Sequence, residues 1–152
     1  MRVLVTETLS EQGLDLLRKD FQVDVRTDLA KGDLAAELAP YDGLVIRSAT
    51  QVTTAVLAAA PNLKVIARAG IGLDNVDVEE ATRRGVMVVN APQSNILSAA
   101  EHTLALLLAV ARNVPQAHTA LKQGKWERSK WEGMELHGKT LGVVGLGRVG
   151  AL

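Results

Sequence analysis

Short apolar runs alternate with polar-faced segments along most of this chain. The apolar runs, rich in Val, Leu and Ile, each predict a β-strand and lie at residues 3–5, 21–25, 44–46, 64–67, 86–89 and 141–144. Segments with helical spacing or composition separate most of them, at residues 10–19, 33–38, 53–60, 77–84 and 98–113. Strands this uniformly apolar have no face suited to water. The pattern therefore predicts an α/β fold in which helices cover both faces of a parallel sheet.

A polar break at residues 90–95 divides the chain. Five predicted strands precede the break, which is enough for a compact flavodoxin-like unit. The helix predicted at residues 98–113 then leads to the sixth predicted strand, at residues 141–144. We therefore expect one domain over residues 1–94 and the start of another over residues 95–152.

Several polar residues and one glycine have the positions of helix ends and turns. Asp77 and Ser98 each precede a glutamate by three positions, which is the spacing of a helix start. Gly85 follows a predicted helix and is expected to end it. Asp74 and Asn75 are expected to form a turn, because their side chains readily bond to nearby backbone. We assign all five residues to structure.

The second predicted domain ends in a glycine motif. Gly145, Gly147 and Gly150 have the spacing G-x-G-x-x-G. The spacing alone is a weak signal, but a predicted strand directly precedes it, as a dinucleotide-binding turn requires. The motif predicts a Rossmann nucleotide-binding domain, in which the following helix holds a pyrophosphate on its N–H groups. Only two residues follow Gly150, so we expect a truncated domain in which NAD binding is nearly lost.

Two arginines directly follow predicted strands. Arg47 comes after the strand at residues 44–46, and Arg68 after the strand at residues 64–67. Ligands of parallel sheets bind beyond the carboxyl ends of the strands, and guanidinium groups pair well with phosphate and carboxylate. The two arginines therefore predict a site for a doubly anionic small molecule. The alternative is that each is an exposed charge balanced by Asp42 or Glu80.

A glycine turn follows the second of these arginines. The backbone N–H groups of Gly70, Ile71 and Gly72 could form a concave nest for a carboxylate. The alternative is a plain tight turn between a strand and a helix.

The charge balance and the cysteine content narrow the classes of function. Lys plus Arg and Asp plus Glu both number 17, so no charge excess attracts nucleic acid or anionic lipid, and we expect small molecules and proteins as partners. The chain has no cysteine, which excludes disulfides and thiolate chemistry. Its histidines, at positions 102, 118 and 137, lack the spacing of a shared metal site, so we expect no metal. No apolar stretch has the length of a membrane span or the form of a signal peptide, so we expect a cytoplasmic protein.

Six segments together closely resemble the D-isomer-specific 2-hydroxyacid dehydrogenases, and within them the branch that acts on D-3-phosphoglycerate. These segments are residues 47–50, 67–77, 89–92, 98–101, 124–128 and 138–150. The resemblance covers essentially the whole chain and implies that it is the amino-terminal part of such an enzyme. It also implies NAD-dependent oxidation of 3-phosphoglycerate to 3-phosphohydroxypyruvate, the entry step of serine biosynthesis.

The same resemblance implies roles for individual positions. It places Arg47, Ser48, Arg68 and Arg128 at the substrate, with the arginines handling its phosphate and Arg128 reaching the site of a neighbouring subunit. It places the turn of Gly70, Ile71 and Gly72 against the substrate carboxylate and the nicotinamide. The cofactor-binding positions that it implies are Ile71, Gly145, Gly147, Arg148, Val149 and Gly150.

The resemblance also places a subunit interface and the catalytic residues. The helix at residues 98–113 lies at the interface of a homo-oligomer in the family. The catalytic Arg, Glu and His of the family lie beyond residue 152, so we expect this chain by itself to be inactive.

Two alternatives stay open at this point. One is a reductase, dependent on NAD or NADP, that acts on another D-2-hydroxy acid such as glyoxylate or hydroxypyruvate. The other is a non-catalytic role in which the chain pairs with intact subunits through the apolar face of the helix at residues 98–113. A helix buried in a core has the same pattern, so the sequence does not separate these cases.

Overall fold

The computed structural model describes residues 1–29 and 34–152. Residues 1–94 form one compact unit and residues 95–152 form another. The helix predicted at residues 33–38 is described from Leu34 onward, as α2 (Leu34–Glu37), and its first residue lies outside the described part.

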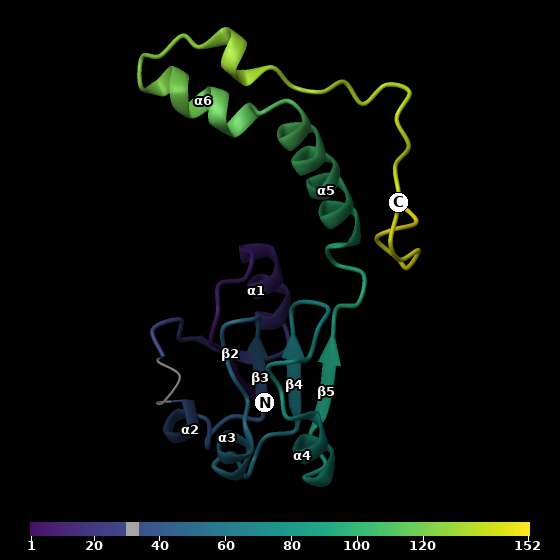
Figure 1. Cartoon of the computed structure of the whole chain (residues 1–152). Helices are drawn as coiled ribbons and strands as arrows, with labels where there is room; N and C mark the ends of the chain where they lie inside the picture. Colours follow the sequence, from purple (N-terminus) through teal and green to yellow (C-terminus); the bar gives the residue numbers. More distant parts are fainter. Residues whose placement is uncertain (30–33) are drawn as a thin grey trace. The chain divides into compact units, whose positions relative to one another are not determined.

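A five-stranded parallel sheet forms the centre of the first unit. Its strands are β1 (Arg2–Val5), β2 (Gln22–Val25), β3 (Gly43–Ile46), β4 (Val65–Arg68) and β5 (Met87–Asn90). They lie side by side in the order β2-β1-β3-β4-β5, and every neighbouring pair is parallel. Figure 1 shows β3, β4 and β5 as arrows that point the same way. This order is that of a flavodoxin-like fold, so the predicted fold class is confirmed.

The two faces of the sheet are covered by different helices. On one face, a row of apolar side chains in register packs with residues of α2, α3 (Thr54–Ala58) and α4 (Val78–Arg83); the row consists of Leu4, Leu44, Ile66 and Val88. On the other face, Val3, Val5 and Val45 pack with Leu14 of α1 (Glu11–Arg18). Side chains alternate between the two faces of a strand, so consecutive apolar residues pack against the helices on both faces of the sheet.

Short helices of the first unit begin at side chains that bond to their free N–H groups. Thr53 accepts from the N–H of Val56 at the start of α3, and Asp77 accepts from the N–H of Glu80 at the start of α4, at 3.0 Å. Gly85 has a φ of 72° after α4, a conformation that favours glycine. The predicted helix start at Asp77 and the predicted helix end at Gly85 are thus confirmed.

The second unit is helical. It contains α5 (Ile96–Ala111), α6 (Val114–Lys122) and the 3-10 helix η1 (Arg128–Trp131). The prediction that Ser98 starts the long helix is wrong, because α5 begins two residues earlier and Ser98 lies inside its first turn. α5 and α6 are separate helices because Asn113 between them takes a left-handed φ of 51°. None of the helices in the described residues has the length and apolar character that a membrane crossing needs.

The sixth predicted strand, at residues 141–144, is also wrong. These residues have no backbone ladder with any described neighbour, the chain bends at Val144, and the Val144 side chain is fully exposed. The apolar pattern is present, but a strand exists only where another strand accepts and donates its hydrogen bonds. The first strand of the predicted Rossmann domain is therefore not formed.

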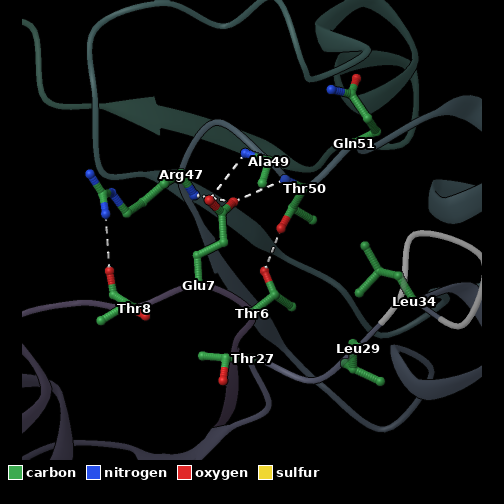
Figure 2. Close-up of a pocket in the computed structure, with 10 residues that line it drawn as sticks. All are labelled: Thr6, Glu7, Thr8, Thr27, Leu29, Leu34, Arg47, Ala49, Thr50 and Gln51. Atoms are coloured by element: carbon green, nitrogen blue, oxygen red, sulfur yellow. Dashed lines mark hydrogen bonds between the residues drawn. The ribbon is translucent and has the colours of Figure 1, made fainter.

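β1 and β3 are also connected beyond their ends. Residues 47–50, which we call the β3 loop, leave the sheet after Ile46. Glu7, two residues after β1, accepts from the N–H groups of Arg47 (2.8 Å), Ala49 (3.1 Å) and Thr50 (3.0 Å). Figure 2 shows the carboxylate of Glu7 facing these three nitrogens. One side chain thus replaces the strand partners that the loop has lost.

The hydrogen bonds to the β3 loop shift the pKa of Glu7. Partial burial raises this pKa, whereas the backbone N–H groups of Thr50, Ala49 and Arg47 together lower it and outweigh the burial. The pKa therefore lies below its ordinary value. The charged form of Glu7 is the form that the fold stabilises.

We expect the Glu7→Gln substitution to reduce the free energy of unfolding by about 1–2 kcal/mol near pH 7, because a neutral amide oxygen is a weaker acceptor than a carboxylate. The folded-state pKa of Glu7 is lowered, so its stabilisation is complete above the unfolded-state pKa of about 4.3 and is lost as the pH falls through the folded-state pKa. The stability difference between the native chain and the variant should therefore shrink below about pH 4.3.

Urea denaturation followed by circular dichroism, repeated across the acid range, measures this difference. Glu79→Gln is the matched control, because Glu79 forms a highly exposed ion pair with Arg83 on α4. A difference for Glu7→Gln that stays constant or grows in acid contradicts the expected role of the carboxylate.

Candidate functional site

The two arginines that follow predicted strands lie at the ends of neighbouring strands. β3 and β4 pair in a register that sets Ile46 beside Arg68, and Arg47 is the next residue after Ile46. Arg68 is half-buried, and Arg47 is exposed. The parallel sheet therefore brings Arg47 and Arg68 to the same edge, the edge at which parallel sheets bind their ligands.

The carboxylates that could have balanced these arginines have other partners. Asp42 accepts from the Nζ of Lys64 at 2.7 Å, and Lys64 holds the pKa of Asp42 below its ordinary value. Glu80 pairs with Arg83 and Arg84 of its own segment, and these two cations likewise lower its pKa. The alternative in which Asp42 or Glu80 neutralises the arginines is therefore not what the structure shows.

Neither arginine has a carboxylate within ion-pair distance in the part of the chain that the structure describes. A guanidinium nitrogen of Arg47 donates to the backbone carbonyl of Thr8 at 3.4 Å, and the Nε of Arg68 donates to the side-chain oxygen of Asn75 at 3.0 Å. Both bonds are to neutral groups. The two positive charges are thus available to an anion.

Asn75, like Glu7, is a residue of this site that the sequence did not identify. The sequence assigned it to a local turn, but its side chain instead reaches across to the β3 loop. Its Nδ2 donates to the carbonyls of Arg47 (2.8 Å) and Thr50 (2.7 Å), while its Oδ1 accepts from Arg68, and the residue is only 3% exposed. The sequence shows only that Asn75 follows the glycine turn. That position fits a bond to nearby backbone as well as a bond to the distant β3 loop.

Residues 70–72, which we call the glycine turn, lie against the Arg68 side chain. A Cβ atom at Gly70 would lie 2.6 Å from a terminal guanidinium nitrogen of Arg68. The carbonyl of Gly70 accepts from the N–H of Ala91, and that of Ile71 accepts from the side chain of Asn90. The turn is thus held from the end of β5, and a residue without a side chain lets Arg68 fold over it.

The predicted nest in the glycine turn has a different form. The N–H of Gly70 donates to the carbonyl of Arg68 at 2.8 Å, so it is not free for an anion. No residue of the turn has the positive φ of an αR-αL nest. The N–H groups of Ile71 and Gly72 have no acceptor among the described residues, so they are the groups of this turn that can still meet a carboxylate.

A cavity of about 420 Å³ opens beside the β3 loop. Figure 2 shows Arg47 reaching toward Thr8 at one end and two leucines at the other. The residues that line it are Thr6, Glu7, Thr8, Thr27, Leu29, Leu34, Arg47, Ala49, Thr50 and Gln51. The positive end of the cavity is formed by Arg47, and Ser48 lies exposed next to it.

The remaining predicted site residues belong to the second unit. Arg128 is exposed in η1. Gly145 has a φ of 95°, and a Cβ atom at Gly150 would collide with the carbonyl oxygen of Gly145. The N–H of Ala151 donates to the carbonyl of Gly147 at 3.0 Å, which starts a helical turn. The backbone here forms a tight loop followed by a hydrogen-bonded turn, without the preceding strand.

Comparisons with known proteins show which family this chain resembles. The family model described as D-isomer specific 2-hydroxyacid dehydrogenase, catalytic domain, matches residues 3–142. The D-3-phosphoglycerate dehydrogenase of Archaeoglobus fulgidus is 52% identical over 151 residues, which cover 99% of this chain and 29% of that protein. D-3-phosphoglycerate dehydrogenase 2, chloroplastic, of Arabidopsis thaliana is 53% identical over 98% of this chain and 24% of its own length. The chain thus spans less than a third of the curated relatives that it matches.

Solved structures show the same likeness. A protein of Thermus thermophilus superposes with a TM-score of 0.91 and 39% identity, covering 99% of this chain and 50% of that one. The NAD-dependent formate dehydrogenase of Staphylococcus aureus, solved in complex with NAD, superposes with a TM-score of 0.84 and 29% identity, covering 99% and 51%. Because the family model matches far more than half of the residues, the chain belongs to the D-isomer-specific 2-hydroxyacid dehydrogenases.

Proposed function

We propose that the protein to which this chain belongs oxidises D-3-phosphoglycerate to 3-phosphohydroxypyruvate with NAD, the step that begins serine biosynthesis. One observation carries the proposal: Arg47 and Arg68 lie at the ends of neighbouring strands, and their guanidinium groups bond only to neutral groups within the described residues. Two guanidinium groups from the same edge of the sheet, neither with a carboxylate partner, suit a phosphate, which has nearly two negative charges at neutral pH. The relatives named for this activity support the same choice.

In this proposal the two ends of the substrate bind to different parts of the site. Its phosphate binds to Arg47 and Arg68 with Ser48 beside them, and Arg128 of a neighbouring subunit adds a third cation. Its carboxylate binds to the N–H groups of Ile71 and Gly72, which lack other acceptors in the described structure. Anchoring both ends fixes the carbon between them, and such orientation is itself a large part of catalysis.

The backbone at residues 145–151 fits the pyrophosphate of NAD. Gly145 and Gly150 occupy positions where a side chain would be strained or would collide, and the N–H groups of Arg148 and Val149, following Gly147, would hold the phosphates at the start of the helical turn. NAD, when bound, accepts the hydride that leaves C2 of the hydroxy acid. Ile71 of the glycine turn would lie at the nicotinamide end.

The arginine pair should set the preference for a phosphorylated acid. We expect the 152-residue chain to bind 3-phosphoglycerate more tightly than D-glycerate, and we expect Arg68→Ala to weaken 3-phosphoglycerate binding by about tenfold or more, because a charge-assisted bidentate contact is lost. Titration followed by NMR or calorimetry measures both affinities. Arg84→Ala is the control, because Arg84 is paired with Glu80 on α4.

Two outcomes would count against this use of the arginines. Equal affinities for the two acids would favour an unphosphorylated substrate such as glyoxylate or hydroxypyruvate. An Arg68→Ala variant that binds 3-phosphoglycerate as the native chain does would remove Arg68 from the site.

We further propose that residues 1–152 by themselves do not catalyse the reaction. The resemblance to the family assigns the catalytic Arg, Glu and His to positions beyond residue 152, and the strand before the glycine motif is not formed. NADH absorbance should therefore stay constant when the chain is mixed with NAD and 3-phosphoglycerate. The full-length enzyme of Archaeoglobus fulgidus serves as the positive control, and measurable NADH production by the chain would refute the proposal.

A second copy of the chain is the proposed partner of α5. Leu104, Leu107 and Leu108 are 51%, 36% and 56% exposed on this helix, an unusual density of exposed apolar side chains. We expect a dimer in size-exclusion chromatography with light scattering, and Leu108→Glu should convert it to a monomer. Leu16→Glu on α1 is the control, because Leu16 is similarly exposed but lies outside α5. A native chain that elutes as a monomer contradicts this assignment.

A further inference from the structure

We propose that Asn75 is a positioning residue that fixes Arg68 relative to the β3 loop, so that Arg47 and Arg68 bind one anionic group as a pair. Asn75 lies between the two segments that bear the arginines. The proposal takes its ligand, a phosphorylated hydroxy acid, from the proposed function.

The side chain of Asn75 uses all of its hydrogen-bonding groups in this bridge. Its two N–H groups donate to the carbonyls of Arg47 and Thr50, and its oxygen accepts from the Nε of Arg68. An arginine nitrogen only donates and a carbonyl only accepts, so the amide has one possible orientation. At 3% exposure, water does not compete for these bonds.

The backbone around Asn75 fixes where this amide lies. The carbonyl of Asn75 accepts from the N–H of Val52 at 2.8 Å, and the N–H of Asp77 donates to the carbonyl of Val52 at 2.9 Å. Val52 and Val76 form a parallel bridge between the two segments. The backbone of Asn75 is therefore held in place independently of Arg68. Its side-chain amide is a fixed acceptor for the Arg68 guanidinium.

The bridge holds Arg68 by one nitrogen and leaves the other two for a ligand. Among the described residues, the Nε bond to Asn75 is the hydrogen bond that Arg68 donates from its side chain. Gly70 provides the space on the other side of the guanidinium, since a Cβ there would meet a terminal nitrogen. The paired terminal nitrogens can then form the two parallel bonds that a phosphate accepts.

The β3 loop is held from both sides in the same arrangement. Its N–H groups donate to Glu7, and two of its carbonyls accept from Asn75. Arg47 belongs to this loop, so its Cα position is set by the same amide that orients Arg68. Loss of Asn75 should therefore affect both arginines, whereas loss of Arg68 should affect one.

Substitutions at position 75 separate the two parts of this role. Asn75→Ala removes the bridge entirely. Asn75→Asp keeps an acceptor for the Nε of Arg68 but has no donor for the carbonyls of the β3 loop. Asp can replace Asn in holding the Nε of Arg68 but cannot hold the β3 loop. Its negative charge would also repel an anionic ligand, so Asn75→Ala is the variant that tests affinity.

The first measurement needs no ligand. In the 152-residue chain, NMR hydrogen exchange of the arginine Nε–H groups should show Arg68 protected relative to the exposed Arg47. The protection should be lost in Asn75→Ala and kept in Asn75→Asp. An Arg68 Nε–H that exchanges as fast as that of Arg47 in the native chain overturns the proposal without any variant.

The second measurement uses 3-phosphoglycerate and D-glycerate as probes. Affinity for 3-phosphoglycerate should fall about tenfold in Asn75→Ala, as expected for the loss of a positioned charge-assisted bond, with a much smaller change for D-glycerate. Asn75→Ala should also weaken 3-phosphoglycerate binding when Arg68 is already replaced by Ala, because it still displaces Arg47. This further weakening should be smaller than the effect of Asn75→Ala in the native chain. Asn62→Ala is the matched control, because Asn62 is an exposed asparagine that donates to the carbonyl of Ala39.

The outcomes distinguish this proposal from the proposed function. A folded Asn75→Ala chain that binds 3-phosphoglycerate as the native chain does overturns the role of Asn75, as does equal weakening for both acids, which a purely structural role would produce. A native chain with a protected Arg68 Nε–H that binds neither acid supports the positioning role and contradicts the proposed substrate. If Asn75→Ala does not fold, the hydrogen exchange of the Arg68 Nε–H in the native chain and in Asn75→Asp still tests whether residue 75 holds Arg68.

Discussion

The site depends on how the β3 loop satisfies its backbone hydrogen bonds once β3 leaves the sheet. A buried or half-buried backbone group without a partner destabilises the fold by an amount comparable to a lost hydrogen bond. Here three N–H groups donate to the single carboxylate of Glu7, and two carbonyls accept from the single amide of Asn75. Two side chains from outside the loop therefore fix its path. Because Arg47 is part of the loop, the same bonds fix the backbone position from which its guanidinium side chain extends.

This arrangement explains why two like charges can lie at neighbouring strand ends. Arg47 and Arg68 bond to neutral oxygens within the described structure, so their charges are oriented but not neutralised. The nearby carboxylates have other partners: Glu7 accepts from backbone N–H groups, Asp42 pairs with Lys64, and Glu80 pairs with Arg83 and Arg84. Cations held in place before a ligand arrives lose little conformational entropy on binding it, which favours affinity and selectivity.

The sequence predicted the elements whose causes are local or periodic. The five strands of the sheet follow from uniformly apolar runs, and the starts and ends of short helices follow from residues such as Asp77 and Gly85. The rules for parallel sheets placed Arg47 and Arg68 at the same edge, whereas the pairing of β3 with β4 came from the structure. The sequence could not predict Glu7 and Asn75, because their bonding partners lie 40 to 43 and 25 to 28 positions away along the chain. No spacing rule connects residues that meet only through the fold.

The strand predicted at residues 141–144 shows that a local pattern can also predict an element that does not form. Its apolar pattern matches those of the five strands that form, yet hydrophobicity provides only the tendency to be buried, whereas the ladder needs a partner strand. The glycine loop after it nevertheless has its positive φ at Gly145 and its close approach at Gly150, because those features arise within six residues. A nucleotide-binding loop can therefore take part of its shape before the sheet that supports it exists. The proposed anion site at β3 and β4 has the opposite character, since the bonds from Glu7 and Asn75 that fix the β3 loop come from distant parts of the chain. The geometry of the first unit's arginines thus depends on the completed sheet, while the glycine motif of the second unit has its local shape without the preceding strand.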